Sequence, residues 1–278
     1  MLPLSDPLWR ELRGPYGSSE EVPLLLTRLQ EQYDAEDKDK LYWEHLYHQN
    51  TLYSCTYAAV PYLAVLAHNT DNPETKLDIY IQCGIFEANN GNGPENEVAA
   101  EYARDGIQVS PETAQDIYRS YRKAVAGLAA LGPTLIDYVR SEQPESEKRY
   151  FLAAAAAYAG SKAAACMLLT FSGGDEYVFG CSECGEDVYL WPEEPECETL
   201  IVYKDDPVNE PDQPGSRIER REPETMEDGG FRVLYRQAEL VGDATMLHHL
   251  PELAGDTDCP HCGVRQHIWP GLLRIFNG

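Results

Sequence analysis

The spacing of apolar side chains predicts helices through most of residues 1–172. Apolar residues that recur three and four positions apart mark one face of a helix. The first helix should begin at Ser18 or Ser19, because a serine hydroxyl can accept hydrogen bonds from the unpaired N–H groups of the first turn. The apolar face of this helix consists of Val22, Leu25, Leu26 and Leu29.

The same spacing, together with several start signals, predicts further helices. Ser110 and Pro111 combine a capping side chain with a proline at the first helical position. Pro61 lies within a helical pattern and should kink or restart the helix there. Alanine-rich segments near residue 160 should pack centrally, because small side chains let two backbones approach. The predicted helices cover residues 38–48, 52–67, 73–88, 111–131, 145–158 and 161–169.

Helices of this length, joined by short polar turns, predict a fold made mainly of α-helices. Antiparallel helix pairs stacked side by side would form an α-solenoid, although no strict sequence period accompanies them. From Phe171 onward the composition changes, and four short apolar runs predict strands. These runs are residues 177–179, 188–190, 200–203 and 231–235. We therefore expect a helical-repeat domain over residues 1–172 and a small β-containing domain over residues 173–278.

A repeated motif, C-x-x-C-G-x5-W-P, carries the clearest chemistry in the chain. It occurs at residues 181–192 and again at residues 259–270. Two thiolates on one tight turn can hold one edge of a tetrahedral ion, and a second turn completes the set. The glycine after each pair suits a turn that needs a positive φ, and short strands should follow at Asp187–Trp191 and Arg265–Trp269. The repeat predicts a zinc ribbon with the ligands Cys181, Cys184, Cys259 and Cys262.

Four cysteines fill a tetrahedron and leave no open position for water, which indicates a structural ion and not a catalytic one. His261 and His267 can each replace a thiolate in principle, but the cysteine set is complete without them. The alternative is a pair of redox or disulfide sites. Neither motif lies between a strand and a helix as a thioredoxin-type site would, so the metal interpretation is favoured.

A polar, acidic segment separates the two cysteine pairs. Proline and acidic residues dominate residues 192–230, a composition that cannot bury an apolar core, so Asp205–Gly230 is predicted to be a mobile loop. Two interpretations stay open: a solvated excursion of the chain, or an arm that docks a partner. In the second interpretation the candidate contacts are Glu193, Glu194, Asp205 and Asp206.

The net charge separates two classes of partner. The chain has 22 Lys and Arg against 47 Asp and Glu, a net charge of −25. Zinc ribbons that bind nucleic acid need a basic surface, so a nucleic-acid partner is not expected. A strong negative field speeds encounter with basic proteins, although solubility alone is an alternative explanation.

The remaining cysteines indicate the compartment. Cys55, Cys83, Cys166 and Cys197 have no regular spacing, and Cys55 and Cys166 lie among apolar residues, where we expect buried small hydrophobes. Free thiols and metal thiolates suit a reducing compartment. With neither an amino-terminal signal nor an apolar run of membrane-spanning length, we expect a soluble cytoplasmic protein without a membrane partner.

Residues Tyr42–Leu63 resemble the first helical pair of bacterial HEAT-like repeat proteins. The shared pattern is W-x-x-L-x-H-Q-[GN]-T-[VL]-Y-x-[AC]-[ST] followed by V-P-[FY]-L, with Asn50 where glycine is expected at the turn. Similar helical-repeat proteins are linked to polymorphic toxin systems as immunity proteins. The resemblance implies a HEAT-like fold and a binding role. It is looser over residues 30–170 and supplies no catalytic residue.

The aromatic and histidine side chains of this stretch have two interpretations each. Tyr53 and Tyr57 are candidates for a recognition face, because tyrosine is favoured at interfaces, and packing between helices is the alternative. His45 and His48 lie about one helical turn apart. They can form a metal pair, but a core or capping role is favoured because no third ligand is evident.

Three classes of function follow from these observations. The leading hypothesis is a non-enzymatic, cytoplasmic immunity protein that occludes a basic toxin or effector domain. The alternative is a zinc-ribbon adaptor in transcription or RNA processing, which requires a basic patch that the sequence lacks. An enzyme built on paired acids such as Glu20 and Glu21 is weakly indicated, because acidic neighbours are abundant by composition alone and no phosphate loop, His-Glu-x-x-His or Gly-x-Ser-x-Gly motif occurs.

Overall fold

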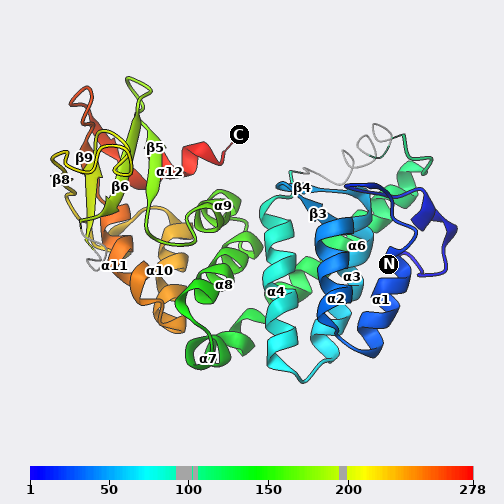
Figure 1. The fold of residues 1–278 in the computed structure, drawn as a ribbon. Helices are drawn as coiled ribbons and strands as arrows, with labels where there is room; N and C mark the ends of the chain where they lie inside the picture. Colours follow the sequence, from blue (N-terminus) through cyan, green and yellow to red (C-terminus); the bar gives the residue numbers. More distant parts are fainter. Residues whose placement is uncertain (92–101, 103–105, 194–198, 278) are drawn as a thin grey trace. The chain divides into compact units, whose positions relative to one another are not determined.

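The structure of the chain, a computed structural model, describes residues 1–91, 102, 106–193 and 199–277 (Figure 1). Contacts divide the chain into two compact units, Met1–Leu135 and Ile136–Gly278. Helices make up most of the described chain and small antiparallel sheets complete it, which confirms the mainly helical class. Within these ranges no helix has both the length and the apolar character needed to cross a bilayer.

The first unit is built around helix α3 (Ser54–Asn69), most of whose side chains are buried. Helices α1 (Val22–Glu31), α4 (Pro73–Ala88) and α6 (Pro111–Ala129) pack against it (Figure 1). α3 runs through Pro61 without restarting. The unit also contains η1 (Pro7–Arg10), β1 (Arg13–Gly14), β2 (Gly17–Ser18), α2 (Ala35–Asp39) and the start of α7 (Gly132–Glu142).

Capping explains where these helices begin. Ser110 accepts a hydrogen bond from the Thr113 N–H at the start of α6, as the sequence predicts. The predicted cap of α1 is wrong, because that helix begins after Glu21, which makes no side-chain capping bond. The Ser19 hydroxyl is buried and donates to backbone carbonyls of an earlier turn instead. The buried serine therefore ties the amino-terminal segment together and leaves the helix end uncapped.

Residues 38–48 do not form the single helix that their apolar spacing predicts. A π-helix, η2 (Lys40–Leu46), follows α2 directly. The chain then enters a hairpin in which β3 (Tyr47–His48) pairs with β4 (Thr51–Leu52).

The turn of this hairpin explains the asparagine in the motif. Gln49 and Asn50 both have positive φ, 47° and 59°, as a two-residue hairpin turn of the primed type requires. Asparagine adopts this conformation more readily than most residues. The Tyr47 hydroxyl also donates to Asn50 Oδ1 at 2.8 Å, an interaction that glycine cannot make.

The second unit joins helices to a sheet. Helices α8 (Glu145–Tyr158) and α9 (Lys162–Thr170) form the predicted hairpin, and their alanines are mostly buried. α8 packs against α10 (Gly229–Val241), α9 packs against α12 (Ile268–Ile275), and α11 (Ala244–Leu253) packs on α10. These contacts place α8 and α9 in the same unit as the sheet. The division at residues 135 and 136 thus precedes the composition change near residue 172.

The sheet of this unit has four antiparallel strands in the order β5-β6-β7-β8. The inner face of the sheet is buried, and α12 packs on it so closely that a Cβ at Gly271 would lie 2.7 Å from Phe179 Cδ2. A separate ribbon pairs β9 (Asp256–Asp258) with β10 (Arg265–His267). The strands of the sheet are β5 (Tyr177–Gly180), β6 (Asp187–Pro192), β7 (Leu200–Tyr203) and β8 (Ser216–Arg217).

Two predicted strands of this unit are corrected. Phe231–Tyr235 lies inside α10, where Asp228 caps the helix and Phe231, Leu234 and Ala238 form a buried helical face. The strand expected at Arg265–Trp269 ends at His267, because α12 begins at Ile268. Pro270 is tolerated in the first turn of that helix, since its missing N–H would have no partner there.

Part of the acidic segment between the two cysteine pairs, residues 192–230, is hydrogen-bonded to the rest of the unit. β8 pairs with β7, and Glu219 exchanges two backbone hydrogen bonds with Asp256 at 2.9 and 3.0 Å. The backbone N–H of Arg221 donates to the carbonyl of Pro251. The segment predicted as a mobile loop, Asp205–Gly230, thus contains ordered anchors, including the short helix η3 (Pro223–Thr225).

A buried ion pair lies among the helices of this unit. Arg149 on α8 and Asp243 at the start of α11 are 2 % and 0 % exposed, and Arg149 Nη2 lies 3.5 Å from Asp243 Oδ1. Arg149 also donates to the carbonyl of Ser172, and the Asp243 carboxylate accepts from the Met246 N–H. The pair therefore connects α8, α11 and the chain that leads into the sheet.

Candidate metal centre

Two turns of matching geometry carry the repeated cysteine motif. In each turn the first cysteine N–H donates to the carbonyl five residues later, and its own carbonyl accepts from the glycine N–H four residues later. Gly185 and Gly263 have φ of +77° and +75°, which confirms the predicted need for glycine. The first turn follows β5 and the second connects β9 to β10. A repeat in sequence has thus become a repeat in structure.

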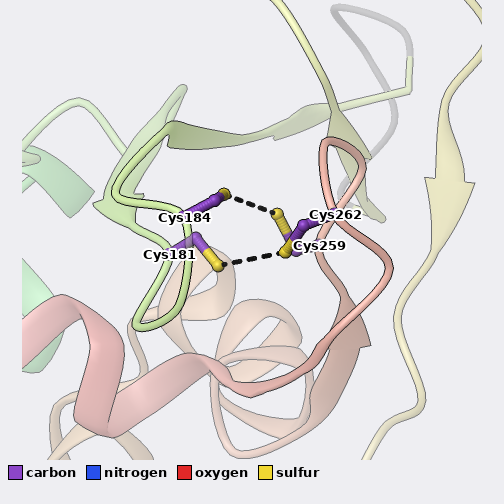
Figure 2. Close-up of side chains that lie close together, drawn as sticks. All are labelled: Cys181, Cys184, Cys259 and Cys262. Atoms are coloured by element: carbon purple, nitrogen blue, oxygen red, sulfur yellow. Dashed lines mark hydrogen bonds between the residues drawn. The ribbon is translucent and has the colours of Figure 1, made fainter.

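The four sulfur atoms of these turns face one another (Figure 2). Cys181 Sγ lies 3.7 Å from Cys262 Sγ, Cys184 Sγ lies 3.8 Å from Cys259 Sγ, and all four sulfurs lie within 4.8 Å of one another. A disulfide would need about 2.05 Å. Metal–sulfur bonds of about 2.3 Å in a tetrahedron place the sulfurs about 3.8 Å apart. The spacing therefore fits four thiolates around one metal ion.

The site lies at the surface of the second unit. Cys181 and Cys259, the first cysteine of each turn, are buried, whereas Cys184 and Cys262 are exposed. The cluster is closed on the protein side and reachable by solvent on the other. Exposure of these two cysteines would give a chelator access to an ion held there.

The thiols shift one another's pKa. Burial raises the pKa of Cys181, but the N–H groups of Cys184 and Glu183 outweigh it, and that pKa falls to about 6. The Glu186 N–H lowers the pKa of Cys184, yet partial desolvation and the neighbouring thiols raise it to about 12. Ionisation of one thiol therefore raises the free energy of ionising the next, unless a cation neutralises the negative charges. A divalent ion would supply that charge, and its binding would release the protons that the thiols still carry.

Polar side chains around the cysteines hold the two turns together. Gln266 Oε1, from β10, accepts hydrogen bonds from the N–H and the hydroxyl of Ser182 at 3.0 Å each. Gln266 is itself buried. This side chain connects the first turn to the strand that follows the second turn, and so fixes the relative orientation of the two cysteine pairs.

His261 has a connecting role that sequence reasoning did not identify. Its Nε2 lies 3.1 Å from the carbonyl of Asp187 and 3.0 Å from the carbonyl of Lys204, so this nitrogen carries the proton and donates to both. The second turn is therefore attached to the start of β6 and to the residue after β7. No motif in the sequence signals this bond, because it joins residues far apart in the chain.

A cluster of charges flanks the β9–β10 ribbon. His267 Nδ1 lies 2.5 Å from Asp256 Oδ1, and Arg221 Nη2 lies 2.5 Å from Asp256 Oδ2. Asp256 is buried, which alone would raise the pKa of its carboxyl, but the partners His267 and Arg221 hold that pKa below its usual value. His267 is therefore engaged by a carboxylate and does not complete the sulfur cluster.

The other cysteines and histidines stay away from this cluster. Cys55 and Cys83 are buried in the first unit, and burial raises the pKa of Cys55 to about 12; Cys166 is half-buried, and Cys197 lies outside the described residues. His45 lies on η2 beside Glu21, whereas His48 lies on β3 beside Tyr16. The two histidines therefore do not share a helix face, which removes the geometric reason for the metal pair that was the less favoured alternative.

The predicted partner contacts fall in different environments. Glu193 and Asp205 are exposed and Asp206 is half-buried, while Glu194 lies outside the described residues. Tyr53 is half-buried. Tyr57 is buried, with its ring against Tyr118 and Tyr121 and its hydroxyl donating to Asn90. A tyrosine placed in this way packs the first unit and does not offer a surface contact.

Comparison of the chain with protein-family models, curated proteins and solved structures finds no match in any of the three. The resemblance of residues 42–63 to HEAT-like repeat proteins stays an expectation.

Proposed function

We propose that the chain is a non-enzymatic binding protein whose second unit is held together by a structural zinc ion. The observation that carries the proposal is the complete set of four thiolates at tetrahedral spacing, Cys181, Cys184, Cys259 and Cys262. A filled tetrahedron leaves no position for water or substrate, so the ion serves the fold. Thiolate ligands in this geometry select zinc, or iron as the competing metal, over the oxygen-seeking Ca²⁺ and Mg²⁺.

The proposed ion joins two parts of the unit that are distant in sequence. The first turn follows β5 of the four-stranded sheet, and the second belongs to the β9–β10 ribbon. The bonds of Gln266 and His261 complete this connection. Zinc binding would in this way orient the sheet and the acidic segment that leaves it.

We further propose that the partner is a basic toxin or effector domain, which the chain occludes as an immunity protein in the cytoplasm. The net charge of −25 supports a basic partner and opposes a nucleic acid. The resemblance of residues 42–63 supports the immunity role and a HEAT-like stacking of the helices of the first unit. A reducing cytoplasm suits a site built from thiolates.

Metal analysis tests the first part of the proposal. Protein purified without chelator should contain one zinc per chain, and Co²⁺ in its place should give the visible absorption of a tetrahedral thiolate site. Iron in place of zinc, or no metal bound to folded protein, would overturn the assignment.

A neutralisation experiment tests the second part. Proteins captured on the full chain from its native host are expressed alone and together with it. A basic protein whose toxic activity the chain blocks would support the immunity role. Retention of nucleic acid, or of the transcription or RNA-processing machinery, would favour the adaptor instead.

A further inference from the structure

The outer face of the four-stranded sheet is aromatic. Strand pairing aligns Val178, Tyr189 and Tyr203 in one row across β5, β6 and β7, and aligns Trp191 with Ile201 in the next row. Helix α12 packs on the opposite face of the sheet. Tyr189, Trp191 and Tyr203 are half-buried, so part of each side chain stays accessible, whereas Ile201 is buried where the chain at Gly215 lies against it. We call these five side chains the aromatic face.

Carboxylates surround the aromatic face. Asp187 precedes Tyr189 by two residues and shares its side of β6, while Asp205 and Asp206 follow the end of β7. Burial raises the pKa of the Tyr189 hydroxyl, and the fields of these three carboxylates raise it further. Burial also raises the pKa of the Tyr203 hydroxyl, and the field of Glu193, the residue after β6, raises it further. Glu193, Asp205 and Asp206, three of the acids predicted as partner contacts, thus belong to the same surface as the aromatic face.

The second cysteine turn positions part of this set of carboxylates, which we call the acidic rim (Asp187, Glu193, Asp205 and Asp206). The bond from His261 to the carbonyls of Asp187 and Lys204 holds the start of β6 beside the residue that precedes Asp205. His261 lies between Cys259 and Cys262, two of the proposed metal ligands. Binding of the ion would therefore also fix the position of this part of the acidic rim. The basic side chain of Arg217 lies on the same side of the sheet, since β8 pairs it with Ile201.

Aromatic rings and carboxylates both attract positively charged groups, and arginine in particular. The face of a tyrosine or tryptophan ring attracts a cation, and arginine does so most readily because its planar guanidinium also stacks. A guanidinium can at the same time form paired hydrogen bonds with a carboxylate. An extended segment places alternate side chains on one side, which matches a flat sheet surface.

We propose that the aromatic face binds an extended, arginine-rich segment of a protein partner, with guanidinium groups stacked on Tyr189, Trp191 and Tyr203 and paired with Asp187, Glu193, Asp205 and Asp206. This inference rests on the proposed function, because it identifies the surface that would hold a basic partner.

Tryptophan side chains report binding at this face directly. The chain has four tryptophans, of which Trp191 lies on the aromatic face and Trp43, 46 % exposed, lies in the first unit. The zinc-loaded full chain is titrated with the peptide (Gly-Arg)4 at low salt while the indole N–H signals are followed by NMR. A Trp191→Phe variant assigns the relevant signal. The Trp191 signal should move and the Trp43 signal should not.

Variants test the two components of the surface separately. Tyr189→Leu with Tyr203→Leu keeps apolar cover but removes the aromatic faces, and should weaken peptide binding about tenfold. Asp205→Asn with Asp206→Asn should weaken it severalfold at low salt. The matched control, Glu31→Gln with Glu36→Gln, removes the same charge from exposed positions of the first unit and should change binding much less.

A gain of affinity provides a test that misfolding cannot imitate. Arg217→Gln removes a positive charge from the aromatic face, so the peptide should bind severalfold more tightly to this variant. Peptide that binds with unchanged affinity to the tyrosine variant would overturn the aromatic face as the site, while a basic partner would still be supported. A chain that does not bind the basic peptide at low salt would overturn both the site and the basic partner.

Discussion

Arg149 and Asp243 form an ion pair that water cannot screen, because both side chains are buried. Burial raises the pKa of Asp243 and the arginine opposes that shift. Arg149→Met leaves the carboxylate without its cation inside the unit. We expect this change to lower the free energy of unfolding by about 3–5 kcal/mol, measured by urea denaturation.

An exposed arginine supplies the control for this prediction. Arg119 pairs with Asp116 at 3.0 Å on the surface of α6, and both side chains are more than half exposed. Arg119→Met should cost less than about 1 kcal/mol. Adding Asp243→Asn to Arg149→Met should recover part of the loss. Equal, small losses for the two single variants would contradict the argument.

His45 makes the stability of the first unit depend on pH. Burial lowers the pKa of this histidine below its usual 6.5, and the nearby Glu21 offsets only part of the effect. Below pH 6.5 the unfolded chain therefore binds a proton that the folded chain resists. The contribution of His45 to stability is present at pH 7 and is lost as the pH falls toward 5. In His45→Gln, denaturation series at several pH values should show a smaller decrease over this range; an unchanged slope would assign the pH dependence to other groups.

At the scale of elements, the proposed metal ion would join two turns that are distant in sequence. Cys184→Ser should abolish stoichiometric zinc binding and destabilise the second unit by more than about 4 kcal/mol, because metal-binding free energy acts as folding free energy. Hydrogen exchange should show the loss in residues 136–277 and little change in residues 1–135. Cys166→Ser, a half-buried cysteine of the same unit, is the control and should retain zinc. Equal exchange changes in both units would contradict a local role for the ion.

Local signals predicted many of the elements, and tertiary contacts decided the others. Ser110 with Pro111 located α6, and the two Cys-x-x-Cys-Gly turns located the metal centre, since each depends on residues adjacent in sequence. The run Phe231–Tyr235 has both β-forming residues and helical spacing, and packing against α8 and α11 selects the helix. The bond from His261 to Asp187 joins residues 74 positions apart, which no local pattern can reveal.

At the scale of the whole molecule, the charge of −25 should act on the rate of association. Long-range attraction accelerates encounter and is screened by salt, whereas dissociation depends on close contacts. Replacing Glu193, Glu194, Asp205 and Asp206 with Gln or Asn should slow association with a basic partner severalfold at low salt. Surface-plasmon kinetics at two ionic strengths measure this effect. An unchanged association rate would assign the acidity to solubility alone.

The distance along the chain between the two cysteine turns has a consequence for how such proteins can diversify. Cys184 and Cys259 are 75 residues apart, yet their sulfurs meet. The proposed ion would close the chain at that point, and the free energy of closing a flexible loop rises only slowly with its length, by about 0.6 kcal/mol per doubling. Related chains can therefore gain or lose many residues between the turns and keep the ion. The length of this stretch should be the most variable feature among relatives, and the spacing within each turn the least.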